Sequence, residues 1–446
     1  MATVVGPPRV GRGRGEGLRA EVGQRLSSAP GRLRAVGGLL VVLMVAFGAL
    51  TAVQVSQRST AAENVRTHSQ PLSNDAAEIF RSLADADTTA ATGFLQAGSE
   101  SQAVRARYNS DVQRASALLA QAAARTSADD PGQQWITKLN QQLPSYTSLV
   151  STAGSYNRVG YPLGGAYLRF ASANMQQDGG MLTQARALYD AETARLHRDY
   201  ADAKSFPWAA IGLGLVALAV LAWTQLRLFR RTNRVFNPGL VTATLLTLAG
   251  LLWLTAGQTL ATLSLSDANS HGSAPLQIIN TARITALQCR GAENLNLVAR
   301  GSTTDYEDSW EKKLQPAMSA DLSQARGATG GDAAAQADLS AVSTQWTAWQ
   351  KQHDAAKSLN DGGAYDRAVA ATIGTASQDQ GTISATFNAL DKSLSDAVQH
   401  EQAQFAQHAA DAHDATSGLA VGAAVLAALA ALAAVLGINR RVAEYR

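Results

Sequence analysis

Four long stretches of the chain contain no charged residue, and this feature limits the possible folds most strongly. They run from Ala35 to Gln57, from Ser205 to Leu226, from Val235 to Ser266 and from Ala415 to Asn439. A helix needs about 20 mainly apolar residues to cross the hydrocarbon core of a bilayer, which is about 30 Å thick. The sequence therefore predicts four transmembrane helices, which we place at residues 35–57, 205–226, 239–261 and 415–439.

The distribution of arginine predicts the orientation of the chain. Segments that stay in the cytoplasm carry more Lys and Arg than translocated segments. The leader 1–34, the link 227–238 and the tail 440–446 are rich in Arg, whereas the loops 58–204 and 262–414 carry more acidic than basic residues. We therefore expect a multi-pass protein of the plasma membrane. Its N and C termini and the link are expected to be cytoplasmic, and both loops extracytoplasmic.

The first apolar stretch has an alternative interpretation as a cleaved signal peptide, because Thr51 and Ala52 offer small residues near its end. Its length favours an uncleaved anchor. The net charge of +3 does not indicate nucleic-acid binding, because the excess of Arg lies beside the predicted spans, where orientation accounts for it. We expect the Gly/Arg-rich leader to contact membrane lipid.

The order of span, loop and span occurs twice, and short sequence matches accompany it. Gly164-Gly165-Ala166-Tyr167-Leu168-Arg169 recurs as Gly362-Gly363-Ala364-Tyr365-Asp366-Arg367. Ser69-Gln70-Pro71-Leu72 corresponds to Ser273-Ala274-Pro275-Leu276. Matches at corresponding places indicate an internal duplication.

Each loop is predicted to form a bundle of about four helices. Apolar residues recur every three or four positions at Leu72, Ala76, Ile79, Leu83, Ala86, Ala90 and Phe94, and again at Ile383, Phe387, Leu390, Leu394 and Ala397. Turn-forming residues divide the loops near 97–100, 127–132, 157–165, 300–304, 327–332 and 360–363. The predicted fold is an all-α integral membrane protein with four transmembrane helices and two duplicated extracytoplasmic four-helix-bundle domains. Pro71 and Pro275 are expected to kink the helices that enter the bundles.

The repeated Gly-Gly-Ala-Tyr-x-Arg motif is the most specific local feature. Its candidate residues are Gly164, Gly165, Tyr167, Gly362, Gly363 and Tyr365. A structural turn followed by a packed Tyr is the favoured interpretation, and contact with a partner is the alternative. The candidate cytoplasmic contact consists of Arg227, Arg230, Arg231 and Arg234.

Sequence motifs of enzymes are not found. There is no phosphate loop, no Gly-x-Ser-x-Gly, no kinase motif set and no His-Glu-x-x-His. His400, His408 and His413 are not spaced as a helical metal pair requires. We expect Cys289 to be a buried small side chain. The sequence therefore predicts a non-enzymatic protein with no catalytic residue, no cofactor and no metal.

The architecture and one stretch of sequence resemble a known family. The stretch reads Asn157-Arg158-Val159-Gly160-Tyr161-Pro162-Leu163-Gly164-Gly165-Ala166-Tyr167-Leu168-Arg169-Phe170-Ala171-Ser172. It is similar to a motif in the first outer domain of the actinobacterial GlnX-type membrane proteins, which have tandem four-helix domains between spans. The resemblance implies a relay. An extracytoplasmic solute-binding lipoprotein of the GlnH type reports an amino acid, and a cytoplasmic serine/threonine kinase of the PknG type adjusts nitrogen metabolism.

The leading functional hypothesis is a non-enzymatic transmembrane signal relay from the amino-acid-binding protein to the kinase. One alternative is a chemoreceptor-like sensor that binds a small molecule directly between its helices. Another is an accessory or structural membrane protein. The sequence leaves the ligand and the oligomeric state open.

Overall fold

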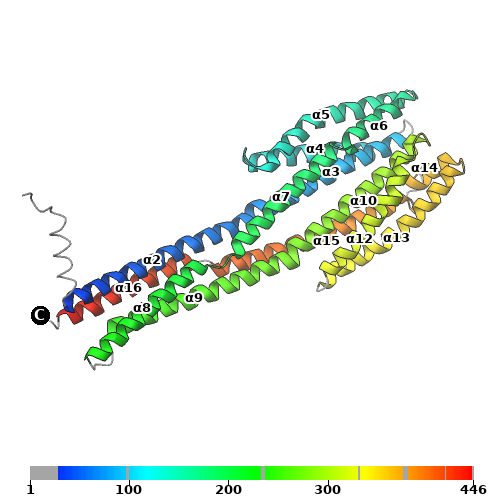
Figure 1. Cartoon of the computed structure of the whole chain (residues 1–446). Helices are drawn as coiled ribbons and strands as arrows, with labels where there is room; N and C mark the ends of the chain where they lie inside the picture. The colour runs from blue at the N-terminus through cyan, green and yellow to red at the C-terminus, as the bar shows by residue number, and fades with distance from the viewer. Residues whose placement is uncertain are drawn as a thin grey trace, which may run out of the picture. The chain divides into compact units, whose positions relative to one another are not determined.

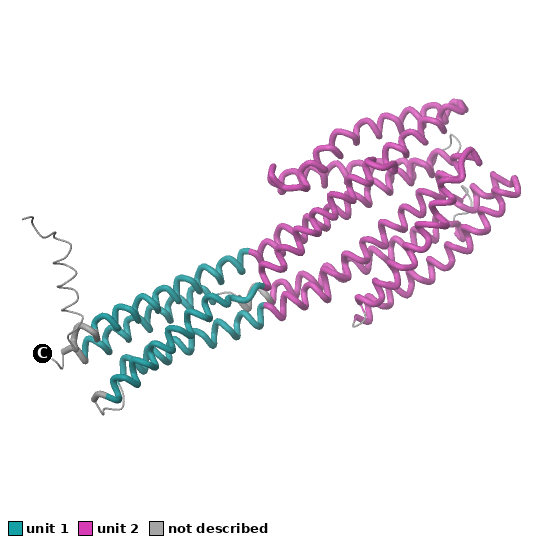
Figure 2. The backbone as a smooth tube through the Cα atoms, in the orientation of Figure 1, with its two compact units in different colours: residues 1–60, 205–261, 414–446 teal, residues 61–204, 262–413 magenta. Residues whose placement is uncertain are grey.

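The computed structural model describes residues 29–96, 100–232, 237–329, 332–374, 380–416 and 418–443. Every regular element in these ranges is helical (Figure 1), so the predicted all-α fold is confirmed. The chain divides into two compact units (Figure 2). Unit 1 comprises residues 1–60, 205–261 and 414–446, and unit 2 comprises residues 61–204 and 262–413.

Unit 1 is formed by α2 (Ala29–Asn64, which ends in unit 2), α8 (Trp208–Thr232), α9 (Pro238–Ala268, which also ends in unit 2) and α16 (Leu419–Ala443). Among the described residues, four helices are long and apolar enough to cross a membrane. Large apolar side chains such as Val42, Leu252 and Leu432 are exposed, as expected of a surface that contacts lipid tails. The chain is therefore a membrane protein.

Small and polar residues hold the helices of unit 1 together. A Cβ atom on Gly239 of α9 would lie 2.5 Å from the Cα atom of Gly437 of α16, so glycine permits this close approach. Gln225 Nε2 of α8 donates a hydrogen bond to Thr244 Oγ1 of α9 at 2.7 Å. Gln54 Oε1 of α2 accepts one from the backbone N–H of Ala210 at 3.3 Å. Small residues and interhelical hydrogen bonds are the usual means of packing helices in a bilayer.

The first half of unit 2 contains α3 (Gln70–Leu95), α4 (Gln102–Arg125), α5 (Pro131–Arg158), α6 (Leu163–Gln176) and α7 (Met181–Lys204). The second half contains α10 (Ala274–Ala299), α11 (Asp305–Ser309), α12 (Gln315–Ala328), α13 (Ala333–Asp361), α14 (Tyr365–Ile373) and α15 (Ile383–Thr416).

Each half has a short additional helix, α6 or α14, that the sequence analysis merged with the long helix after it. The break before α7 contains Gly179 with φ +80°, and the break before α15 contains Gly374 with φ +85° and Gly381 with φ +83°. Glycine adopts positive φ without a steric penalty, so these residues allow the chain to reverse.

Among the described residues of unit 2, three π-helical segments interrupt the α-helices, and each is followed by a proline. The segments are η1 (Val65–Ser69), η2 (Asn269–Ser273) and η3 (Trp310–Leu314). The prolines are Pro71, Pro275 and Pro316, each two residues after the segment ends. Proline has no N–H to donate, and its ring collides with the carbonyl four residues earlier in a regular α-helix. A π-helical turn relieves this conflict without ending the helix.

The predicted apolar faces form the core of unit 2. Leu72, Ala76, Ile79, Leu83 and Ala86 of α3 are all less than 3 % exposed, and the five predicted positions of α15 are buried as well. The core is continuous between the halves, because α3 packs against α10. The two halves therefore belong to one compact unit.

Hydrogen bonds also join the halves. Asn294 Nδ2 of α10 donates to Thr92 Oγ1 of α3 at 2.9 Å. Ser273 Oγ donates to Gln70 Oε1 at 2.8 Å, and this pair is buried. Buried polar groups of this kind fix the relative register of two helices, because a shift would leave them without partners.

Candidate functional site

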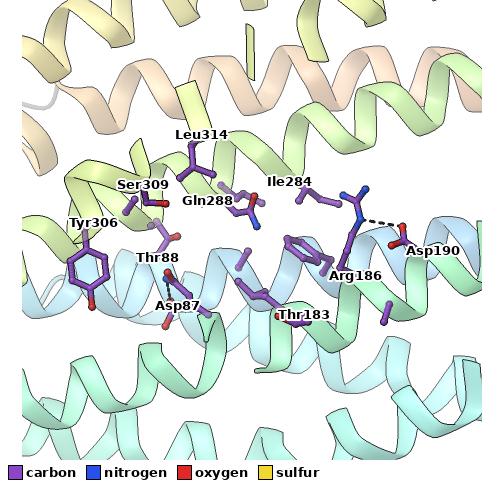
Figure 3. Close-up of a pocket in the computed structure, with 18 residues that line it drawn as sticks. Asp87, Thr88, Thr183, Arg186, Asp190, Ile284, Gln288, Tyr306, Ser309 and Leu314 are labelled. Carbon is purple, nitrogen blue, oxygen red and sulfur yellow. Dashed lines mark hydrogen bonds and ion pairs between the residues drawn. The ribbon is translucent and has the colours of Figure 1, made fainter. Parts of the chain in front are cut away.

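A cavity of about 510 Å³ lies within unit 2 where its two halves meet (Figure 3). Its volume is in the range of small-molecule sites in proteins. The first half contributes side chains from α3, α6 and α7, and the second half contributes side chains from α10, α11 and η3. The polar lining residues are Asp87, Thr88, Gln176, Thr183, Arg186, Asp190, Gln288, Tyr306 and Ser309.

Asp87 is the most unusual group of this lining, because it is a buried carboxylate held by neutral donors. It is 2 % exposed. Ser172 Oγ donates to Oδ1 at 2.9 Å, Gln176 Nε2 donates to Oδ2 at 2.8 Å, and the Tyr146 hydroxyl donates to Oδ1 at 3.3 Å. Burial raises the pKa of Asp87, and these hydrogen bonds oppose the shift.

Arg186 lies at the other end of the labelled side chains in Figure 3, beside Asp190. Its Nε atom donates to Asp190 Oδ1 at 3.1 Å, one helical turn further along α7. Arg186 also lies over the ring of Tyr189, 5.7 Å from its centroid. Thr88 of α3 and Gln288 of α10 also line the cavity, so polar groups of both halves contribute to it.

A second buried polar cluster lies in the second half of unit 2, and its groups are paired with one another. Glu293 accepts a hydrogen bond from Arg290 Nη1 at 2.7 Å and lies 3.0 Å from His353 Nδ1. Arg290 is 2 % exposed and also donates to the carbonyl of Thr372. Buried charges that are paired and hydrogen-bonded in this way favour a structural role.

The repeated motif occupies different positions in the two halves. Gly164 and Gly165 lie inside α6 and are buried, and a Cβ atom on Gly164 would be 2.9 Å from the carbonyl oxygen of Ala153. The ring of Tyr167 stacks on that of Tyr156, with centroids 5.4 Å apart. The motif thus brings α6 close to α5.

In the second half, the same motif forms the turn between α13 and α14. Gly362 caps α13 and Gly363 has φ +78°. The Tyr365 hydroxyl donates to the carbonyl of Leu297 at 3.1 Å, and the guanidinium group of Arg300 lies 4.4 Å from the Tyr365 ring centroid. Tyr365 thereby connects α14 to the end of α10.

The candidate cytoplasmic arginines are only partly described. Arg227 and Arg230 lie near the end of α8, and the guanidinium group of Arg227 is 4.9 Å from the ring centroid of Trp223. Arg231 falls in α8, but its side chain lies outside the described residues, as does all of Arg234.

None of the cavity residues was predicted from the sequence to be a site residue. Asp87 sits in the stretch Ala84-Asp85-Ala86-Asp87-Thr88-Thr89-Ala90-Ala91, every residue of which is buried. Packing on several sides buries this segment, and its sequence carries no signal of that burial, because a helix with polar residues on every face normally indicates an exposed helix. The partners of Asp87 come from α5 and α6, and no spacing in the sequence indicates that pairing.

The helices that hold Asp87 and Arg186 coincide with a recognised domain. Residues 61–201 match the family model of the actinobacterial sensor domain. This sensor segment extends from the end of α2 into α7 and contains the first-half lining of the cavity. The match supports an actinobacterial sensor protein with a sensory or signalling role. Comparisons with curated proteins and with solved structures found no match.

Proposed function

We propose that this protein is a non-enzymatic transmembrane signal relay, in which unit 2 receives an extracytoplasmic signal and the spans of unit 1 pass it to the cytoplasm. The observation that carries the proposal is the continuity of two long helices. From Ala29 to Leu95 the chain is helical at every residue through α2, η1 and α3, and from Pro238 to Ala299 it is helical through α9, η2 and α10. A continuous helix can transmit a shift or rotation along its axis.

The chain halves have matching elements, which supports an origin by duplication. η1 and η2 both contain five residues, and α3 and α10 both contain 26. Each π segment leads directly into the corresponding α-helix. In a relay built from two equivalent halves, the two corresponding helices α3 and α10 enter the same core and respond to the same change in its packing.

The proposed orientation follows from the basic segments. Arg in the leader, in the link 227–238 and in the tail 440–446 favours cytoplasmic placement of both termini, with unit 2 outside the plasma membrane. We propose that the relay passes the signal to a cytoplasmic partner protein. Such a partner is a serine/threonine kinase in the GlnX-type family that the chain resembles, and we propose Arg227, Arg230, Arg231 and Arg234 as part of its contact.

An exposed apolar patch in the sensor segment supports docking of an extracytoplasmic protein. The patch is defined by four exposed apolar residues of one short segment, Val159 and Tyr161 in the turn after α5 and Leu163 and Phe170 of α6, which are 67 %, 59 %, 56 % and 58 % exposed. Exposed large apolar side chains on a helical domain outside the spans favour contact with a partner. The proposed partner is a solute-binding lipoprotein that carries an amino acid, which connects the relay to nitrogen metabolism.

Affinity capture tests this proposal. The tagged full-length protein is isolated from native membranes in mild detergent, and associated proteins are identified by mass spectrometry. We expect a solute-binding lipoprotein and a serine/threonine kinase. The double variant Tyr161→Ser/Phe170→Ser is expected to lose the lipoprotein and keep the kinase. Gln134→Ser/Gln141→Ser, which changes two exposed residues of α5, serves as the control and keeps both. Recovery of neither partner with wild-type protein contradicts the proposal.

A further inference from the structure

The cavity in unit 2 has the composition of a ligand site. Its lining includes one acidic group, Asp87, that forms no ion pair with any Lys, Arg or His of the described residues. The nearby carboxylate of Asp85, by contrast, pairs with Arg107 at 2.9 Å and with Arg81 at 3.8 Å. A buried carboxylate without a counter-charge is costly to ionise, and a cation placed beside it removes that cost.

Two tyrosines lie near Asp87. Tyr306 lines the cavity, and Tyr146 donates its hydroxyl hydrogen to Asp87. Burial raises the pKa of Tyr306, and the negative charge of Asp87 raises it further. Aromatic faces attract cations, so rings and carboxylate together favour an ammonium group at this end of the cavity.

The opposite end presents a guanidinium group. Arg186 uses Nε for its bond to Asp190, and an arginine side chain has four further N–H donors on its terminal nitrogens. These donors match the geometry of a carboxylate or another planar acid group. Figure 3 shows Asp87 and Arg186 well separated in this view, with Gln288 and Ile284 between them and Thr88 beside Asp87.

We propose that this cavity binds a small zwitterion directly, with its ammonium group beside Asp87 and its acidic group beside Arg186. Thr88 and Gln288 supply polar contacts to the middle of the ligand, and Phe80 and Ile284 contact its carbon chain. The ligand bridges α3 and α7 of the first half to α10 of the second half. Its binding therefore favours one packing of the two halves over others.

This site is separate from the docking of a binding protein on the apolar patch. The patch residues Val159, Tyr161, Leu163 and Phe170 do not line the cavity. A relay driven only by a partner protein does not need a zwitterion in the cavity, whereas direct sensing requires the isolated chain to bind one. Affinity capture therefore tests partner docking, and calorimetry tests direct binding.

Calorimetric titration of the purified full-length protein in lipid nanodiscs tests the inference. The probes are 4-aminobutyrate, 5-aminopentanoate and 6-aminohexanoate, which place the two charges at increasing separation. Pentylamine and pentanoate are the matched compounds with one charge each. We expect at least one of the three zwitterions to bind, and the single-charge compounds to bind about tenfold more weakly or worse, because each lacks one charged hydrogen bond.

Two variants assign the ends. Asp87→Asn is expected to weaken zwitterion binding about tenfold or more, and Arg186→Gln to abolish the preference for the zwitterion over pentylamine. Arg198→Gln, an exposed arginine on the same helix α7 that does not line the cavity, is the control and leaves binding unchanged. If Asp87→Asn does not fold, the variant Arg186→Gln decides the question alone, because Arg186 is partly exposed. The inference is overturned if no zwitterion binds, or if pentylamine and pentanoate bind as tightly as the zwitterions. It is also overturned if Arg186→Gln and Arg198→Gln have the same effect on binding.

Discussion

The Nε2 atom of His353 lies 3.1 Å from Oε1 of Glu307, and its Nδ1 atom lies 3.0 Å from Oε1 of Glu293. The imidazole is therefore held between two carboxylates, while its ring stacks on Trp310 with centroids 4.1 Å apart. Burial lowers the pKa of His353, but the two carboxylates outweigh this effect and raise it to about 9. His353 consequently carries a positive charge at neutral pH, and it connects α13 to both α10 and α11.

The His353 contacts predict a pH-dependent contribution to stability. Because the pKa in the folded state exceeds the ordinary value of 6.5, the contribution is complete below about pH 6.5 and disappears as the pH rises through 9. We expect His353→Gln to lower the free energy of unfolding by about 1–3 kcal/mol at pH 6 and by much less at pH 10. Thermal unfolding of the full-length protein at both pH values measures this. An equal loss at pH 6 and pH 10 would show that the imidazole acts only through packing.

Glu192 predicts the opposite pH dependence. It is 1 % exposed, and neither carboxylate oxygen has a hydrogen-bond partner among the described residues. Burial, together with the negative charge of Asp130, raises the pKa of Glu192 to about 7. Ionisation of this group therefore destabilises the fold increasingly above pH 4.5 and fully above pH 7.

We accordingly expect Glu192→Gln to stabilise the protein by about 1–3 kcal/mol at pH 8 and to have little effect at pH 5. Unfolding midpoints at both pH values provide the test. A destabilised Glu192→Gln variant at pH 8 would indicate that the ionised carboxylate has a partner that stabilises it.

The two glycines of the first motif predict different responses to the same substitution. A Cβ atom on Gly164 would lie 2.9 Å from the carbonyl oxygen of Ala153 and 3.0 Å from the backbone nitrogen of Asn157. On Gly165 the nearest atom would be 3.5 Å away, at the end of the Arg169 side chain. We expect Gly164→Ala to cost about 1–3 kcal/mol, because α5 and α6 must separate. Gly165→Ala is expected to be neutral or stabilising by up to about 1 kcal/mol. Similar unfolding temperatures for the two variants would refute this interpretation of the motif.

Close packing in unit 1 leads to a further prediction. Gly239 touches the backbone of Gly437, so Gly239→Ala forces α9 and α16 apart. Gly212 of α8 has no atom within 4 Å of an added Cβ. We expect Gly239→Ala to lower stability in detergent by about 1–3 kcal/mol and Gly212→Ala to change it by less than about 0.5 kcal/mol. Unfolding curves of the two variants and of the wild-type protein measure this difference. Equal stability of Gly239→Ala and Gly212→Ala would mean that the close contact between α9 and α16 is not maintained.

The elements that depend on local sequence pattern could be predicted from the sequence. Four uncharged stretches are enough to predict four helices of membrane-spanning length, and the spacing of Leu72, Ile79 and Leu83 predicts the buried face of α3. Breaks inside helical regions were harder to place. Gly179-Gly180 lies in the break between α6 and α7, while the equally conspicuous pair Gly164-Gly165 lies inside α6 and packs against α5.

The site depends on contacts that no local pattern contains. Asp87 meets Tyr146 and Ser172 across 59 and 85 residues of sequence, and Asn294 reaches α3 across more than 200. Packing of α3 against α10 creates the cavity, and this contact depends on both halves at once. Because the two halves were predicted as separate domains, the sequence offered no basis for a site between them.

The relay itself is tested most directly by quantitative phosphoproteomics in the native cell. Cells that express the full chain are compared with cells that express a chain lacking unit 2, that is, residues 61–204 and 262–413, after membrane levels of both chains are matched. The account predicts that adding amino acids outside the cell changes serine and threonine phosphorylation of cytoplasmic proteins only when unit 2 is present. The same phosphorylation response in both strains would contradict the proposal that unit 2 and the spans carry the signal.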